Sequence, residues 1–275
     1  MIFLIARRRL MQIAASLVLA LAALVLFVRW LEPRLAFFPF PGETETPHDY
    51  GIPYEAITIV TADGERLKAW IMDAPSPRAR IVYFHGNGGN LSNWAPILAT
   101  IVRRGYSVFA IDYRGYGLST GRPTERGLYR DVDAAVERAW ADAARGMPVI
   151  YWGRSLGCCM AAYAATVHPP NALILEAAFA DAKAAVRGSP VLAVLALFAS
   201  YRFPTADFVN RTTVPVLQMH GDRDSVIPIA VGRDLFSRMR DPKTLTIIKG
   251  GDHNDSVAPD ADAYWMAVDA FVRNS

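Results

Sequence analysis

The fold is decided by the stretch PVIYWGRSLGCCMA, residues 148–161. Its first five residues predict a buried strand that ends at Trp152, and its last four, all compact, predict the start of a helix. Between them lies a G-x-S-x-G motif, a turn so tight that a Cβ on either glycine would collide with neighbouring backbone. Ser155 would then sit at a helix amino end, where free N–H groups and the helix dipole favour developing negative charge. The pattern predicts Ser155 as a nucleophile, the alternative being a structural Gly-Ser turn.

Outward from this stretch, short apolar runs alternate with helical patterns. Runs such as 81–84 and 173–175 are apolar throughout, which is typical of parallel strands covered on both faces. We therefore expect an α/β fold with a mostly parallel sheet, helices on both faces and a site beyond the carboxyl ends of the strands. The predicted strands are 55–60, 66–72, 80–84, 107–112, 148–152, 172–176, 214–219 and 244–249, the first two as a hairpin; the predicted helices lie near 91–104, 125–144, 156–167, 229–239 and 259–273.

A serine hydroxyl needs a base to take its proton, and five histidines are available. His48 lies before the body of the chain, and His168 precedes two prolines at a predicted helix end. His85 and His220 each end a strand before a glycine, where we expect them to orient backbone through hydrogen bonds. His253 lies in a glycine-rich loop between the last strand and the last helix, so it is the predicted general base. The alternative is a solvated loop histidine.

The base in turn needs a carboxylate to hold its tautomer. Asp222 and Asp224 both fall in the turn after the strand near 214–219. Asp224 directly precedes the apolar segment around Ile227, which would pin it against the sheet, whereas Asp222 is expected to cap the turn. The predicted triad is Ser155, Asp224 and His253, in the chain order expected of a nucleophile on a strand–turn–helix.

The negative charge that develops on the substrate oxygen needs two N–H donors. Leu156, directly after the nucleophile, is expected to supply one. The loop HGNGGN at 85–90, here called the oxyanion loop, is expected to supply the other through Asn87, because its glycines allow backbone to approach a ligand. This loop lacks the patterns of a phosphate-binding loop, so a nucleotide site is not expected.

The first thirty residues predict a transmembrane anchor. The run 10–28 is interrupted only by Gln12 and Ser16 and would span roughly 28 Å as a helix. The alternatives are a cleaved signal peptide ending near Ala22 and a buried core helix, but the apolar run continues past that cleavage site. Three arginines at 7–9 favour a cytoplasmic amino end, with the body on the opposite, periplasmic or lumenal, side. We expect an anchor over 1–30, a linker over 31–53 and the catalytic domain over 54–275.

Composition excludes several classes of function. The 275 residues are 52% hydrophobic, and the net charge is +3. The first 34 residues carry five arginines and one glutamate, a charge of +4. The net charge of the rest of the chain is therefore near −1, which predicts no basic surface for nucleic acid. The two cysteines are adjacent and predict neither a disulfide framework nor a zinc site. No metal, organic cofactor or obligate protein partner is expected.

One insertion, at 179–212, breaks the alternation of strands and helices. It contains the apolar run 191–198, which is too short to span a bilayer. It is either a lid over the site or an ordinary packed helix.

With these residues assembled, the chain resembles the α/β-hydrolase superfamily, and more narrowly its membrane-anchored Bem46-like or ABHD-type serine hydrolases. The resemblance runs from about residue 35 to the end and rests on HGNGGN at 85–90, DYRGYG at 112–117, GRSLG at 153–157, DSVIP at 224–228 and HND at 253–255. It implies the same triad and the same two oxyanion donors. Some relatives remove palmitoyl groups from proteins and carry an amino-terminal cysteine cluster, which this sequence lacks, so that activity is not carried over.

The sequence therefore predicts a membrane-anchored serine hydrolase that cleaves carboxylic esters or thioesters of small or lipid-like molecules. Three alternatives stay open: a serine peptidase using the same triad, a catalytically silent binding protein on the same fold, and a lipase acting at the membrane surface through the apolar insertion.

Overall fold

The computed structural model describes residues 2–143, 146–255 and 261–275. Its centre is an eight-stranded sheet in the order β10-β9-β8-β7-β4-β6-β3-β2. The pairs β2–β3 and β3–β6 are antiparallel, and all other neighbours are parallel. The strands are β2 (Glu55–Val60), β3 (Arg66–Met72), β4 (Arg80–Phe84), β6 (Ser107–Ile111), β7 (Val149–Arg154), β8 (Ala172–Glu176), β9 (Val216–Gly221) and β10 (Lys243–Ile248).

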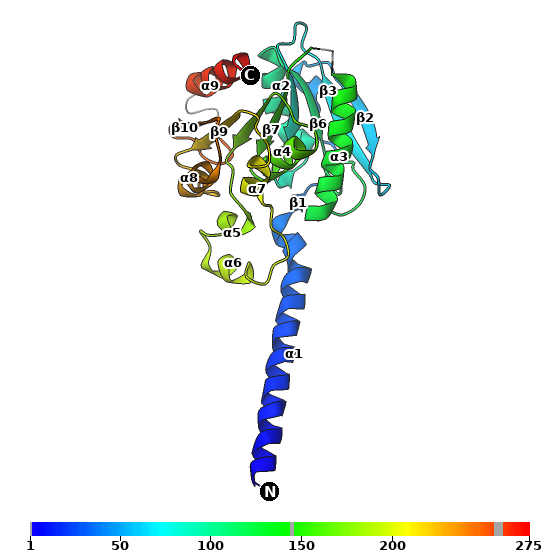
Figure 1. Ribbon diagram of the computed structural model, residues 1–275. Helices are drawn as coiled ribbons and strands as arrows, with labels where there is room; N and C mark the ends of the chain where they lie inside the picture. Colours follow the sequence, from blue (N-terminus) through cyan, green and yellow to red (C-terminus); the bar gives the residue numbers. More distant parts are fainter. Residues whose placement is uncertain (1, 144–145, 256–260) are drawn as a thin grey trace.

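Two apolar layers cover this sheet, one on each face. One layer packs α3 (Glu125–Asp142), α4 (Leu156–Val167) and α8 (Ile229–Arg238) against the strands. The other packs α2 (Leu91–Arg103) and α9 (Ala261–Arg273). The expected α/β architecture, with a mostly parallel sheet between helices, is confirmed (Figure 1). The predicted helix ends at 144 and at 259–260 lie outside the described residues.

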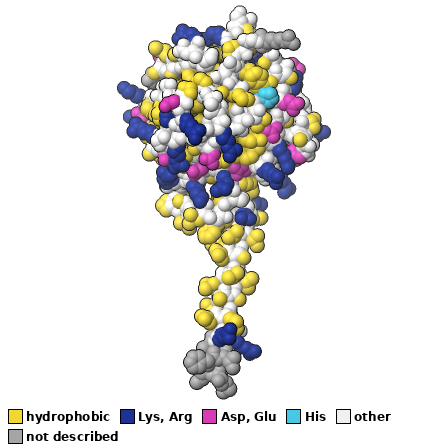
Figure 2. Space-filling model, viewed as in Figure 1, with side chains coloured by type: hydrophobic (Ala, Val, Ile, Leu, Met, Phe, Trp, Pro, Cys, Tyr) yellow, Lys and Arg dark blue, Asp and Glu magenta, His cyan; other side chains and the backbone are white. Residues whose placement is uncertain are grey.

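The amino-terminal helix α1 (Ile2–Ala36) projects from the body as a single rod (Figure 1). From Arg7 to Ala36 it is long and apolar enough to cross a membrane, and little of it packs against the rest of the chain. Figure 2 shows hydrophobic side chains along its length, with arginines near its amino end. The prediction of an irregular linker starting at residue 31 is wrong at its beginning, because the helix continues through Pro33 to Ala36.

The residues after α1 are built into the body. Strand β1 (Phe38–Pro39) pairs in parallel with β5 (Gly88–Gly89), within the oxyanion loop. A 3-10 turn, η1 (Pro47–Tyr50), follows and packs against α2. The segment between α1 and the first strand of the main sheet is therefore ordered by contacts with the loop that the sequence assigns to catalysis.

The insertion forms three short helices, α5 (Ala182–Ala185), α6 (Pro190–Leu195) and α7 (Thr205–Val209). We call residues 181–203 the cap, because with α5 and α6 they lie beside the carboxyl end of α1, at the end of the body from which α1 projects (Figure 1). Every side chain of α6 is at least partly exposed. Whether 191–198 acts as a lid or as an ordinary packed helix stays a prediction.

Candidate active site

The turn between β7 and α4 holds Ser155 in a conformation that L-residues rarely adopt, with φ 52° and ψ −116°. The flanking glycines make this turn sterically feasible. A Cβ on Gly157 would overlap the carbonyl oxygen of Phe84, and one on Gly153 would overlap the carbonyl of Gly157. The Ser155 N–H donates to the Glu176 carbonyl at 2.8 Å, which ties the turn to the end of β8. Backbone strain of this kind, of about 1–3 kcal/mol, concentrates at functional sites.

Asp224 and His253 meet at the carboxyl ends of β9 and β10. The His253 Nδ1 lies 2.8 Å from Asp224 Oδ2, and both side chains are largely buried. The other carboxylate oxygen of Asp224 accepts the N–H groups of Val226 at 3.0 Å and Ile227 at 2.7 Å. Since a carboxylate only accepts, Nδ1 carries the proton and Nε2 is left free to act as a base. Asp222 instead accepts from the Gly250 N–H at 2.7 Å, so it joins its own turn to the turn after β10.

His220 lies beside this pair, in contact with Asp224 and with the segment that binds its carboxylate. Burial lowers the pKa of His220 below its usual value, so the ring is neutral. Its Nε2 donates to the Ile227 carbonyl at 2.8 Å and lies 3.5 Å from Asp224 Oδ2. The segment that binds the Asp224 carboxylate is thereby fixed on its other side, the backbone-orienting role expected of this histidine.

The oxyanion loop is held from several directions. His85 Nδ1 donates to the Gly86 carbonyl at 2.7 Å, which fixes the peptide plane whose N–H belongs to Asn87. The Asn87 carbonyl accepts from the Phe38 N–H and from the Tyr116 hydroxyl, both at 2.9 Å. The predicted donor is therefore oriented by a buried histidine and by the chain segment that follows α1.

One buried polar network was missed by the sequence analysis. The guanidinium of Arg154, inside the G-x-S-x-G motif, donates to Glu176 at 2.7 Å and also to the backbone carbonyl of His253. Glu176 further accepts from the Tyr264 hydroxyl at 2.9 Å. Arg154 thus connects the turn that carries the nucleophile to the loop that carries the base. A charged residue within an otherwise apolar strand end is the signal that could have indicated it.

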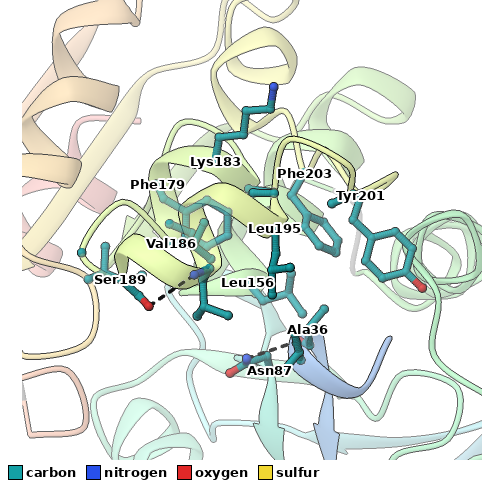
Figure 3. A pocket seen from close by; sticks show the side chains of 18 of the residues that line it. Ala36, Asn87, Leu156, Phe179, Lys183, Val186, Ser189, Leu195, Tyr201 and Phe203 are labelled. Carbon is teal, nitrogen blue, oxygen red and sulfur yellow. Dashed lines mark hydrogen bonds between the residues drawn. The ribbon is translucent and has the colours of Figure 1, made fainter. Parts of the chain in front are cut away.

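Two cavities meet at Ser155. The first has a volume of about 580 Å³ and is walled by α1, the cap, Leu156 and Asn87. Figure 3 shows side chains of Ala36, Asn87, Leu156 and Leu195 gathered around it. The second, of about 700 Å³, is lined by Ser155, Asn87 and His253 together with α2. The structure therefore brings the predicted nucleophile, base and oxyanion donors to one place.

The two cysteines near the nucleophile are buried. Burial raises the pKa of the Cys158 and Cys159 thiols, so neither is an activated nucleophile. Among the residues that the structure describes, no group of three or more His, Cys, Asp or Glu side chains is placed to hold a metal ion.

Residues 75–211 match the family described as serine aminopeptidase, S33. Alpha/beta hydrolase domain-containing protein 17B of Xenopus laevis is 30% identical over 73% of this chain and 69% of its own. Membrane protein YNL320W of Saccharomyces cerevisiae is 28% identical, over 84% of each chain.

Among solved structures, an esterase of Pyrococcus furiosus, Pf2001, superimposes with a TM-score of 0.71 at 18% identity, over 87% of this chain and 98% of that one. The fold and the sequence relatives together identify the protein as a hydrolase of the α/β fold class. The chain belongs to the α/β-hydrolase family that includes alpha/beta hydrolase domain-containing protein 17B.

Proposed function

We propose that the protein is a serine hydrolase that cleaves carboxylic esters or thioesters through an acyl-enzyme. Ser155 Oγ bonds to the acyl carbon while His253 Nε2 takes its proton, and Asp224 stabilises the imidazolium. The N–H groups of Asn87 and Leu156 receive the oxyanion. His253 then protonates the leaving group as its bond to the acyl carbon breaks. A water activated by the same histidine releases the acid.

The observation that carries this proposal is the arrangement of Ser155, His253 and Asp224. Ser155 is held with a positive φ at the amino end of α4, and it shares a cavity with His253. The Nδ1 of that histidine lies 2.8 Å from a carboxylate already fixed by two backbone N–H groups. A merely structural Gly-Ser turn requires no such histidine–carboxylate pair beside it.

A serine aminopeptidase is the second candidate, because the matching family carries that description. An aminopeptidase must bind a free ammonium group on the acyl side of the scissile bond. The carboxylate lining the first cavity, Glu32, already accepts N–H and O–H groups of Ser200 and the N–H of Tyr201. This arrangement favours esters over amino-terminal peptides. Comparing kcat/KM for an acyl ester and for an aminoacyl anilide separates the two functions.

We further propose that α1 anchors the protein in a membrane, with its amino end in the cytoplasm and the body on the opposite side. The length and exposure of α1 and the arginines at 7–9 support this orientation. Ser237→Cys would place an exposed thiol on the body, whereas Cys158 and Cys159 are buried. A membrane-impermeant maleimide is expected to label it in sealed membrane vesicles whose cytoplasmic face is inside. Labelling only in vesicles whose cytoplasmic face is outside would reverse the orientation.

The direct test of the proposed chemistry is labelling by a fluorophosphonate probe in detergent. The wild type and the Ser225→Ala variant, which lacks another serine of the same cavity, are expected to label, and Ser155→Ala is not. If the folded wild type fails to label, or if Ser225→Ala abolishes labelling while Ser155→Ala keeps it, the proposal fails. The first of these results would favour the silent binding protein.

A further inference from the structure

We propose that the first cavity binds the acyl chain of a membrane lipid ester, taken from the bilayer that α1 crosses, and that the second cavity holds the polar leaving group. This inference rests on the proposed serine hydrolase function and names its substrate class. It makes the membrane helix part of the substrate-binding site.

The geometry of the reaction assigns the two cavities. The general acid protonates the leaving group, so the leaving group lies on the side of His253, which lines the second cavity. Leu156, which carries a predicted oxyanion donor, lines the first cavity, and Asn87 lies between the two. With the carbonyl oxygen between Asn87 and Leu156, the acyl chain extends into the first cavity.

The walls of the first cavity suit a hydrocarbon chain. Val28, Leu31 and Leu35 of α1 and Leu192 and Leu195 of the cap line it. Figure 3 shows the labelled side chains around this space to be mostly apolar, with the long Lys183 side chain directed away from them. A volume of about 580 Å³ lies within the range of mostly apolar pockets that bury small-molecule ligands.

The cavity begins where the membrane span ends. Val28 is the last residue of the apolar run that starts at residue 10, and it is also part of the cavity wall. Val191, Val194 and Leu197 of the cap are 69%, 59% and 66% exposed, beside this end of α1. An exposed apolar patch next to a membrane helix favours contact with the bilayer surface. The patch and the helix together would place the mouth of the cavity at the lipid.

Glu32 joins the cap to the membrane helix. Its side chain is buried and accepts from the Ser200 N–H at 3.0 Å, from the Ser200 hydroxyl at 2.6 Å and from the Tyr201 N–H. The cap and the last turns of α1 therefore form one continuous wall, so the acyl site is complete only when both are present.

The second cavity has polar side chains among apolar ones such as Trp94 and Ile97. Asn93 and Thr100 of α2 and Asn254 of the loop that carries His253 could hydrogen-bond to a leaving group in this cavity. Its volume of about 700 Å³ encloses a group the size of glycerol or a lipid headgroup. Because the first cavity is walled partly by α1, we assign the substrate to a lipid of the bilayer and not to an acylated protein.

The test uses the full chain reconstituted in phosphatidylcholine vesicles, with umbelliferyl esters of acetic, octanoic and palmitic acids. We expect kcat/KM to rise about fourfold for each added methylene until the cavity is filled. Leu195→Trp is expected to lower the palmitoyl-to-acetyl ratio of kcat/KM at least tenfold. Leu118→Trp, at an exposed leucine away from the cavity, should leave the ratio unchanged.

Three results would overturn the inference while leaving the proposed function intact. The first is serine labelling and acetyl ester hydrolysis with no preference for longer chains. The second is an unchanged palmitoyl-to-acetyl ratio of kcat/KM in Leu195→Trp, and the third is cleavage of an S-palmitoylated peptide without cleavage of a palmitoyl lipid. Loss of both labelling and acetyl ester hydrolysis would instead overturn the function itself. A further comparison tests entry from the bilayer. The palmitoyl ester is supplied either in the vesicles that contain the enzyme or in separate vesicles, and equal initial rates in the two cases would refute entry from the bilayer.

Discussion

Replacing Asp224 with asparagine should trap His253 in the wrong tautomer. Two N–H groups, from Val226 and Ile227, point at Asp224 Oδ1 at 3.0 and 2.7 Å. Turning the amide nitrogen toward them would sacrifice two buried hydrogen bonds, at about 1–2 kcal/mol each. The amide oxygen therefore stays at that position, and the NH₂ group faces His253 Nδ1. The imidazole must then accept at Nδ1, so Nε2 carries the proton and cannot take one from Ser155.

We expect Asp224→Asn to lower kcat/KM for a soluble acetyl ester by about 10³–10⁴, equivalent to about 4–5.5 kcal/mol of transition-state stabilisation. The melting temperature should change little, because the side-chain volume and the two backbone hydrogen bonds are kept. Asp222→Asn is the matched control, since an amide oxygen can still accept from the Gly250 N–H. Near-wild-type activity in Asp224→Asn, or an equal loss in Asp222→Asn, would refute the assignment of the carboxylate.

Three further predictions follow from the same site. Gly157→Ala should destabilise the protein by about 1–3 kcal/mol or more in urea unfolding, because its methyl group would overlap the Phe84 carbonyl; unchanged stability would contradict the tight turn. His220 is neutral when folded because burial lowers its pKa, so its contribution to stability is present above its usual pKa of 6.5 and is lost as the pH falls toward the lowered value. The slope is at most about 1.4 kcal/mol per pH unit, and His220→Gln should remove it. Arg154→Met should lower kcat far more than it raises KM, because the carbonyl of His253 loses its donor; a change in KM alone would show that Arg154 serves substrate binding instead.

Several strands and the turn at the nucleophile were predictable because their signals are local. The predicted strands 55–60, 66–72, 80–84 and 172–176 coincide with β2, β3, β4 and β8. Each is an apolar or alternating run bounded by residues that end a strand. The turn at Ser155 follows from steric requirements within five residues. Asp224 and His253 could be paired because both follow neighbouring parallel strands, whose carboxyl ends meet at one edge.

The features that the sequence did not reveal depend on contacts between distant segments. Proline inside a helix removes a hydrogen bond, so Pro33 favoured a linker. The helix nevertheless continues to Ala36, where the buried Glu32 binds the backbone of the cap nearly 170 residues away. The network of Arg154, Glu176 and Tyr264 likewise joins segments without any short-range pattern. Hydrophobic periodicity carries no information about such partners.

The strained backbone at Ser155 has a consequence for how this protein can change over evolutionary time. Glycine adopts a φ of 52° without a steric penalty, so Ser155→Gly would relieve about 1–3 kcal/mol of strain, reduced by about 0.5–1 kcal/mol for the freedom glycine regains in the unfolded chain. A variant without the hydroxyl would then be at least as stable as the native chain. Stability alone would therefore favour glycine at this position, and under the proposed function only the chemistry of the hydroxyl requires serine.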